Sequence, residues 1–187
     1  AGQDTANQLR TLGEAYKIWQ ETLKDPTSVI YFGLSGDMVV AGLTPTLTFL
    51  VEHRMIDVFF SQGANLYHDF ARTIGYPRLK TSPQQIDDVT IREKGGVRVY
   101  DVIEPAEPQN VSKVVVAHVA KRMWEEGHRV VTTRQFYYYV GKMLNEWNLV
   151  RSEGILTTCY RNNIPIFVAG PESSVTAMDL AAAQHIE

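Results

Sequence analysis

The chain contains a single cysteine, and this scarcity excludes several kinds of chemistry. Cys159 has no second thiol with which to form an internal disulfide, a metal site or a redox pair. We therefore expect its side chain to be a buried small apolar group rather than a nucleophile.

An excess of basic charge and long apolar runs are also missing. The net charge is −3 and the isoelectric point is near 6.0, so no positive field attracts phosphates and we expect no nucleic acid partner. Apolar runs such as residues 111–120 are shorter than the roughly 20 residues that cross a bilayer, and no signal-peptide pattern opens the chain. These absences predict a soluble, cytoplasmic protein with no membrane partner.

Common catalytic and nucleotide-binding motifs are absent as well. Without a G-x-G-x-x-G pattern, any nucleotide must be held by other means, and no Ser or Cys nucleophile elbow is present. His53, His118, His128 and His185 stand singly, without metal-ligand spacing. We therefore predict no metal site.

What is present is a pattern of buried strands and helices. The 44% hydrophobic composition is enough for a substantial core in one domain. Residues 29–34, 56–60 and 164–168 are short runs that are apolar on both faces, as buried parallel strands require. Helix-like segments follow the first two runs at 44–53 and 66–74, so the chain predicts an α/β fold with an open, mostly parallel sheet and helices on both faces.

Two details of the helices follow from local signals. Thr44 is predicted to cap the first of these helices, with Pro45 at its first position. Residues 76–96 are rich in Pro, Asp, Gln and Gly and predict a long excursion, in which a strand at 89–92 pairs with 97–102. Further helices are expected at residues 1–24, 111–127, 133–147 and 152–162.

Polar segments that contain glycine end the predicted strands, where ligands bind in parallel sheets. Ser35, Gly36 and Asp37 follow the first strand, and residues 61–65 and 169–172 follow the other two. Glycine lets the backbone approach a ligand, while Ser35 and Asp37 can hydrogen-bond a ribose or an amine. The alternative to a binding role is that residues 35–37 form a tight turn in which Asp37 caps the next helix.

A dense polar cluster opens the helix after the second strand, with Asn65, Tyr67, His68 and Asp69 close together. The alternative to a binding role is that Asn65 caps this helix and the first turn is exposed. His68 can transfer protons, but adjacent residues on a helix do not face each other, so His68 and Asp69 are not predicted to form a dyad.

Aromatic residues at 136–139, with Trp147, allow two interpretations. They fit a cage for a cation, or the more common role of a helix face in the core or a subunit interface.

The sequence resembles the deoxyhypusine synthase family, particularly its bacterial and archaeal deoxyhypusine-synthase-like branch. The resemblance is carried by four blocks, at residues 30–38, 50–58, 63–69 and 163–167. It implies that residues 1–187 form a single Rossmann-like NAD-binding domain, incomplete at its C-terminus relative to the family, within a homotetramer whose active sites lie between paired subunits.

The resemblance also implies a reaction. In the family, NAD takes a hydride from spermidine, the resulting imine loses diaminopropane, and the aminobutyl group passes through an enzyme lysine to an acceptor amine. The acceptor is a lysine of the translation factor that carries hypusine, or putrescine in homospermidine-forming relatives. The protein is therefore expected to be an NAD-dependent transferase of polyamine metabolism.

The family's cofactor contacts at the first two strand ends fall on Ser35, Gly36, Asp37, Gln62, Gly63 and Ala64. Its polyamine contacts fall on Tyr67, His68, Glu172 and Asp179. Tyr67 and His68 stand where the eukaryotic enzymes have two consecutive glutamates, so two negative charges are lost and the choice of polyamine stays open.

The family's catalytic lysine belongs to a C-terminal half, and no lysine of this chain matches its motif. We therefore expect that this chain alone does not complete aminobutyl transfer. Two alternatives follow from the resemblance: a homospermidine synthase-like enzyme that uses putrescine, and a non-catalytic paralogue that binds NAD or regulates a sister subunit.

Overall fold

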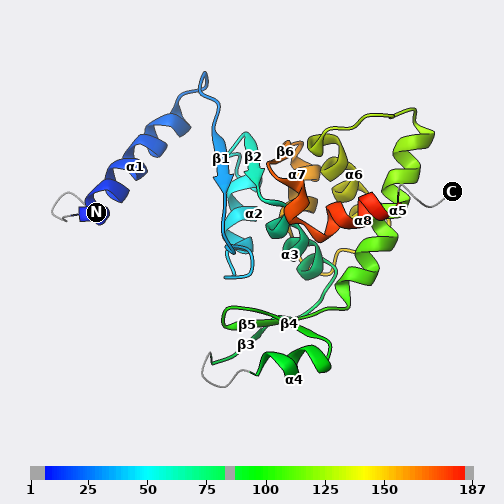
Figure 1. Ribbon diagram of the computed structural model, residues 1–187. Helices are drawn as coiled ribbons and strands as arrows, with labels where there is room; N and C mark the ends of the chain where they lie inside the picture. Colours follow the sequence, from blue (N-terminus) through cyan, green and yellow to red (C-terminus); the bar gives the residue numbers. More distant parts are fainter. Residues whose placement is uncertain (1–6, 83–86, 184–187) are drawn as a thin grey trace.

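The computed structural model describes residues 7–82 and 87–183 (Figure 1). Its central sheet has three parallel strands in the order β1-β2-β6, formed by β1 (Tyr31–Leu34), β2 (Val58–Ser61) and β6 (Ile166–Val168). The α/β class and the three predicted parallel strands are therefore confirmed, with each strand shorter than its apolar run.

Helices surround this sheet and share one core with it. Phe59 of β2 is fully buried, and it belongs to the same apolar cluster as Leu66, Val116 and Ile155 from three different helices. Cys159 lies in this core, as predicted for a small apolar residue. The helices are α2 (Thr44–Glu52), α3 (Gly63–Thr73), α5 (Pro108–Glu125), α6 (Thr133–Glu146), α7 (Ile155–Asn162), η2 (Pro171–Ser173) and α8 (Val175–Ala183).

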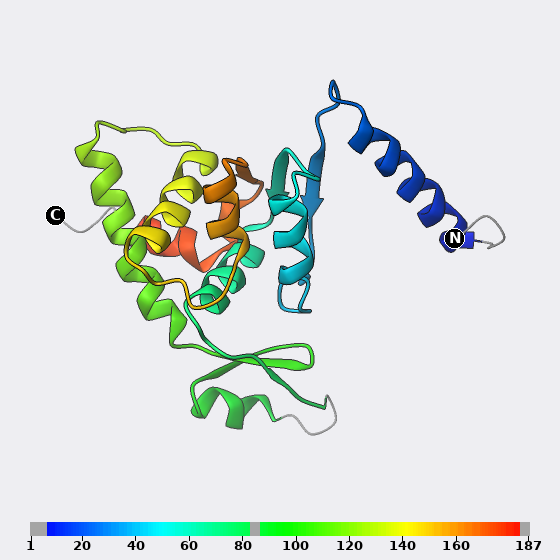
Figure 2. The same ribbon diagram turned by 180° about the vertical axis from the view of Figure 1, so that it is seen from behind.

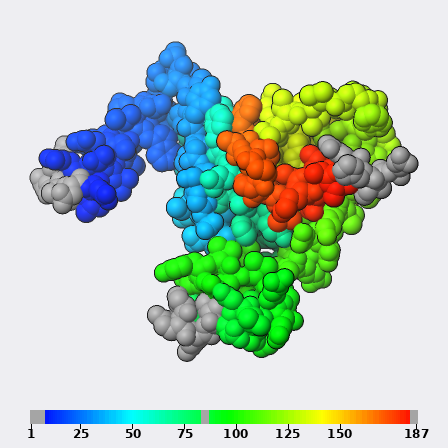
Figure 3. Space-filling model, in the orientation of Figure 1, coloured from blue at the N-terminus to red at the C-terminus, as the bar shows by residue number. Residues whose placement is uncertain are grey.

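A second, antiparallel sheet forms a separate lobe of the molecule, which we call the antiparallel module. It comprises β3 (Leu79–Lys80), α4 (Asp88–Glu93), β4 (Gly96–Val99) and β5 (Val102–Pro105), with strand order β3-β5-β4. Figures 1 and 3 show the module on the side of the molecule toward which the arrow of β1 points. The module therefore lies beside the carboxyl ends of the parallel strands.

The prediction of a strand at residues 89–92 is wrong. Asp87 accepts hydrogen bonds from the backbone N–H groups of Val89 and Thr90, and this N-cap starts the helix α4. The hairpin instead joins β4 to β5, with Val99 opposite Val102. The part of the excursion at residues 83–86 lies outside the described residues.

The predicted cap at Thr44 is also wrong, and Asn65 does not cap its helix as the alternative to a binding role had it. Leu43 precedes α2, and Thr44 is already helical, with the proline in the first turn. The helix α3 begins at Gly63, so Asn65 lies inside its first turn. The side chain of Asn65 instead accepts a hydrogen bond from the backbone N–H of Val39, which ties α3 to the segment after β1.

The first strand and the first helix are less buried than their sequences predict. Tyr31 is 67% exposed, because β1 lies at one edge of the sheet. The helix α1 (Asn7–Lys24) forms as predicted over the described part, but Leu12 and Tyr16 on its apolar face are exposed. Figures 1 and 2 show α1 standing away from the remaining helices. No helix in residues 7–82 and 87–183 is both long and apolar enough to span a membrane.

Candidate functional site

The carboxyl ends of the three parallel strands lie together at one edge of the sheet. Leu34 is in register with Ser61, and Ser61 is in register with Val168. The polar segments that follow, residues 35–37, 62–64 and 169–172, therefore leave the sheet at the same place. We call these three segments the sheet edge, and they bring Ser35, Gly36 and Asp37 into the neighbourhood of Gln62, Gly63 and Ala64.

Two of the glycines of the sheet edge, Gly36 and Gly63, meet different physical demands. Gly36 has a φ of +69°, a left-handed conformation that favours glycine, and a Cβ there would make only an ordinary contact, 3.8 Å from Cε of Met38. At Gly63 a Cβ would lie 2.4 Å from the Cβ of Ser174. Gly63 is therefore needed for α3 to pack against the segment after β6, whereas Gly36 leaves room for a ligand.

The N-terminus of α3 forms part of the sheet edge and has no side-chain cap. Gln62 precedes the helix in an extended conformation and provides no side-chain cap, and the first turn contains no acidic residue. Free N–H groups and the positive end of the helix dipole favour an anion such as a phosphate. The buried Nδ2 of Asn65 has no hydrogen-bond partner among the described residues, so one more donor lies beside this end. Together with the exposed carboxylate of Asp37, these groups fit the phosphates and ribose of a dinucleotide.

Next to the sheet edge, four side chains form what we call the polar cluster: Tyr67, His68, Glu104 and Asp179. Burial and the negative charges of Glu104 and Asp179 raise the pKa of Tyr67 to about 12. The phenol is therefore neutral at physiological pH. The structure thus brings Tyr67, His68 and Asp179 into one neighbourhood, and Glu104 is an addition that the sequence did not indicate.

Asp179 lies on α8 and is 5% exposed. Its Oδ2 accepts a hydrogen bond of 2.6 Å from the hydroxyl of Ser112 on α5. Burial raises the pKa of this carboxyl group, although the bond from Ser112 and the charge of Lys113 act in the opposite direction. Among the described residues no cation forms an ion pair with the Asp179 carboxylate, whose hydrogen-bond partner is Ser112.

Glu104 reaches the cluster from β5 of the antiparallel module. Its Oε2 lies 2.6 Å from Nδ1 of His68, and its Oε1 accepts a hydrogen bond from Nε of Arg78. Arg78 also donates to the backbone oxygens of Val39 and His68, each at 2.7 Å. This network fastens the module to both α3 and the segment after β1.

Two expected members of the site lie elsewhere. Asp69 is fully buried on the core side of α3, where it accepts hydrogen bonds from the backbone N–H groups of Ile155 and Leu156 at 2.8 and 2.9 Å. Asp69 thus caps α7 and is structural. Glu172 is exposed on η2, at the sheet edge rather than in the polar cluster.

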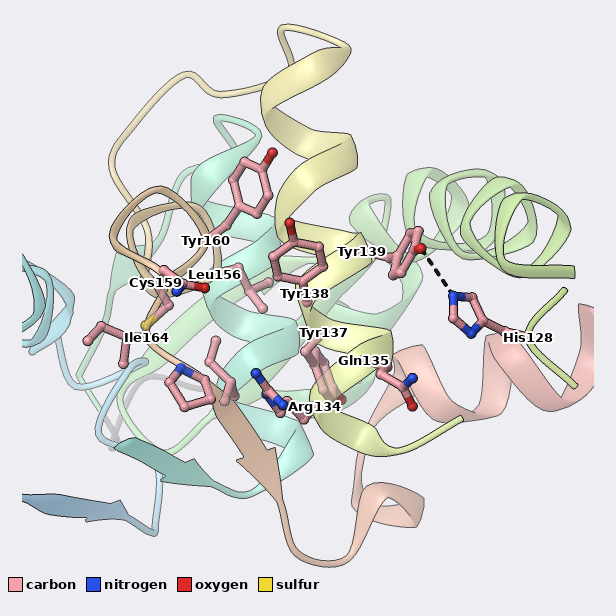
Figure 4. A pocket seen from close by; sticks show the side chains of 13 residues that line it. His128, Arg134, Gln135, Tyr137, Tyr138, Tyr139, Leu156, Cys159, Tyr160 and Ile164 are labelled. Atoms are coloured by element: carbon pink, nitrogen blue, oxygen red, sulfur yellow. Dashed lines mark hydrogen bonds between the residues drawn. The ribbon is translucent and has the colours of Figure 1, made fainter. Parts of the chain in front are cut away.

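The aromatic run does not form one cage. Phe136 and Tyr137 are buried in the core, while Trp147 packs against His118. Tyr138 and Tyr160 line a separate hollow of about 380 Å³ between α6 and α7, and Arg134 lines the same hollow farther along, near Tyr137 (Figure 4). The more common interpretation therefore holds for the first two residues of the run. Of the single histidines, His185 lies outside the described residues.

Comparisons with known proteins identify relatives of this chain. The chain is 32% identical over 181 residues to "Probable deoxyhypusine synthase 2" of Methanosarcina acetivorans, an alignment that covers 97% of this chain and 51% of that protein. It is 31% identical to a "Deoxyhypusine synthase-like protein" of Nostoc, with 95% of this chain and 47% of that protein covered. The chain thus spans about half the length of the curated relatives it matches.

A solved structure shares the fold. The crystal structure of a proposed deoxyhypusine synthase from Entamoeba histolytica superposes with a TM-score of 0.65 at 18% identity, over 98% of this chain and 61% of that one. The family model described as deoxyhypusine synthase matches residues 2–187. This match covers nearly the whole sequence, and the chain therefore belongs to the deoxyhypusine synthase family.

Proposed function

We propose that residues 1–187 form an NAD-binding domain of an enzyme that transfers the aminobutyl group of spermidine to an acceptor amine. The observation that carries the proposal is the meeting of three strand ends beside the uncapped N-terminus of α3, with the polar cluster next to them. The sheet edge would hold the cofactor and the polar cluster would hold the polyamine. When bound, NAD supplies the acceptor for a hydride.

Each part of the sheet edge has a role in this proposal. The first N–H groups of α3, from Gly63 and Ala64, would face the pyrophosphate, and Gln62 would flank it. The carboxylate of Asp37 would accept hydrogen bonds from ribose hydroxyls, and Gly36 with Ser35 would let the cofactor approach the backbone. Membership of the family supports these assignments, since the matched region includes all six residues.

The polar cluster suits one end of a polyamine. Asp179 offers a buried carboxylate with no paired cation among the described residues, and Tyr67 offers a neutral hydroxyl beside it. Glu104 is already engaged by Arg78 and His68, so Asp179 is the carboxylate left for an ammonium group. Glu172, exposed at the sheet edge, would meet the cofactor or the far end of the polyamine.

The enzymatic test uses the whole protein that contains this chain, incubated with NAD and spermidine. Release of 1,3-diaminopropane is expected, and the acceptor is supplied either as the translation factor that carries hypusine or as putrescine. Modification of the factor supports a deoxyhypusine synthase, whereas homospermidine supports the second activity. If no 1,3-diaminopropane is released with either acceptor, the proposed transfer is contradicted. NAD binding without this release would favour the non-catalytic paralogue.

Asp179→Asn is expected to weaken spermidine binding by about 10-fold to 100-fold, because it removes the available carboxylate and keeps an acceptor for Ser112. Calorimetric titration of spermidine measures the change, and NAD affinity should stay within about twofold. Asp88→Asn is the matched control, since Asp88 pairs with Arg98 on the antiparallel module outside the polar cluster. Equal spermidine affinity of the wild type and Asp179→Asn would show that the polyamine binds elsewhere.

A further inference from the structure

Three buried hydroxyl groups meet at the start of α8, and the proposed function uses none of them. The hydroxyl of Tyr137 on α6 lies 3.2 Å from Oγ1 of Thr176, and Oγ1 of Thr176 also hydrogen-bonds Oγ of Ser174. The three residues are only 2%, 1% and 0% exposed. Burial raises the pKa of Tyr137, although hydrogen bonds with Thr176 and Ser174 act in the opposite direction, so the phenol keeps its proton at neutral pH. We call these three side chains the hydroxyl cluster.

Ser174 connects the hydroxyl cluster to the sheet edge. Its Oγ accepts a hydrogen bond of 3.2 Å from the backbone N–H of Thr176, so it caps the start of α8. Ser174 also packs against the first residue of α3, because a Cβ added at Gly63 would lie 2.4 Å from the Cβ of Ser174 and 3.3 Å from its Oγ. The contact between Ser174 and the bare backbone of Gly63 therefore sets how closely α8 approaches the N-terminus of α3.

The third segment of the sheet edge is anchored mainly through Ser174. Among the described residues, the hydrogen bonds of residues 170–173 stay within residues 170–174, such as the bond of 3.1 Å from the N–H of Ser173 to the oxygen of Gly170. Ser174 is buried and belongs to the hydroxyl cluster, in which Tyr137 is the member from another helix. The hydroxyl of Tyr137 therefore links this segment to α6.

We propose that Tyr137 is a positioning residue of the cofactor site, because its hydroxyl holds Ser174, and with it the third segment of the sheet edge, against the first turn of α3. The cofactor in this inference rests on the proposed function. Without the hydroxyl of Tyr137, Thr176 and Ser174 still bond each other, but the start of α8 loses its hydrogen bond to α6. The segment then moves more freely relative to α3, and a cofactor that bridges the two must restrict this motion when it binds.

Tyr137→Phe tests the positioning role, because it keeps the buried ring and removes only the hydroxyl. The affinity for NAD, measured by calorimetric titration of the whole protein that contains this chain, should fall by about 2-fold to 10-fold, which corresponds to the net contribution of one hydrogen bond. Tyr160→Phe is the matched control. Tyr160 lines the hollow between α6 and α7, and its hydroxyl has no hydrogen-bond partner among the described residues, so this variant should bind NAD as the wild type does (Figure 4).

Variants of Thr176 separate positioning from a general loss of stability. Thr176→Ser keeps the hydroxyl and should bind NAD as the wild type does, whereas Thr176→Val keeps the shape of the side chain and should weaken binding as Tyr137→Phe does. Because the two hydroxyls act through the same contact with Ser174, the double variant of Tyr137→Phe and Thr176→Val should lose less affinity than the sum of the two single losses in free energy. Circular dichroism checks that each variant is folded.

The outcomes distinguish this inference from the proposed function. A wild type that binds no NAD would contradict the proposed function, and the nitrogen-15 spectrum without ligand would then test the positioning. In that spectrum Tyr137→Phe should shift the backbone amide signals of Gly63 and Ala64, which lie across the contact with Ser174, and Tyr160→Phe should not. Unchanged signals of Gly63 and Ala64, equal NAD affinity of the wild type and a folded Tyr137→Phe variant, or additive losses in the double variant would each overturn the inference.

Discussion

An alanine at position 154 is expected to destabilise the fold by about 3 kcal/mol or more, at the upper end of the cost of overpacking. The added Cβ would lie 1.9 Å from Oγ1 of Thr73 and 2.9 Å from Oδ2 of Asp69. Gly154 is the N-cap residue of α7, and the Asp69 carboxylate that would be displaced holds the next two backbone N–H groups. Because the Asp69 carboxylate holds both of these N–H groups, it cannot move aside without breaking the junction of α3 and α7.

Urea unfolding followed by circular dichroism measures this loss. Gly33→Ala is the matched control, since Gly33 lies in β1 with nothing within 4 Å of the added Cβ. The control should change the free energy of unfolding by less than about 1 kcal/mol. A Gly154→Ala protein as stable as this control would show that α3 and α7 do not approach as closely as described.

Asp69 is expected to make stability depend on pH between about 4 and 6. Burial raises the pKa of this carboxyl group from 3.8 to about 6, although the N–H groups of Leu156 and Ile155 oppose the rise. The folded state therefore holds the proton more tightly than the unfolded chain does. The contribution of Asp69 is most favourable below pH 3.8 and is lost as the pH rises to about 6, a change of about 2–3 kcal/mol by linkage.

Asp69→Asn isolates this effect, because an amide of the same shape does not titrate. The difference in free energy of unfolding, wild type minus variant, should fall by about 2–3 kcal/mol from pH 4 to pH 7. Asp69→Ala should lose about 2–5 kcal/mol, since it leaves two buried N–H groups of α7 unsatisfied. A wild-type-minus-Asn difference that is constant with pH would contradict the described burial of the carboxylate.

The parallel sheet was predictable because each strand carries a local signal. The three apolar runs are bounded by polar residues and glycine, and buried strands of a parallel sheet need apolar residues on both faces. The register follows from the same pattern, because Leu34, Ser61 and Val168 mark the change from apolar to polar. The shared edge was therefore expected from the sequence.

The antiparallel module shows where local signals failed. Val89 and Ile91 alternate with polar residues, which favours a strand, but the cap by Asp87 and the packing of Ile91 close to Gly96 stabilise a helix instead. Residues 89–92, whose alternating apolar and polar side chains suggested a strand, form about one turn of the helix α4. An aspartate just before the run was the signal that could have identified this helix.

Glu104 was missed because its partners are distant in sequence. It is 36 residues from His68 and 26 from Arg78, and no local pattern joins these three positions. Glu104 lies on the same buried face of β5 as Val102. A buried carboxylate requires partners, so a charged residue at this position was the one sign in the sequence that Glu104 forms such contacts. His68 cannot pair with its neighbour Asp69 on the same helix, and it pairs instead with Glu104 of the antiparallel sheet.

Titration of NAD into the nitrogen-15-labelled chain tests most directly whether the sheet edge is a cofactor site. The backbone amide signals of residues 35–37 and 62–64 should shift together with NAD concentration, while those near Tyr138 and Tyr160 should not. The absence of shifts at the sheet edge, or shifts confined to the hollow between α6 and α7, would contradict the proposed placement of NAD.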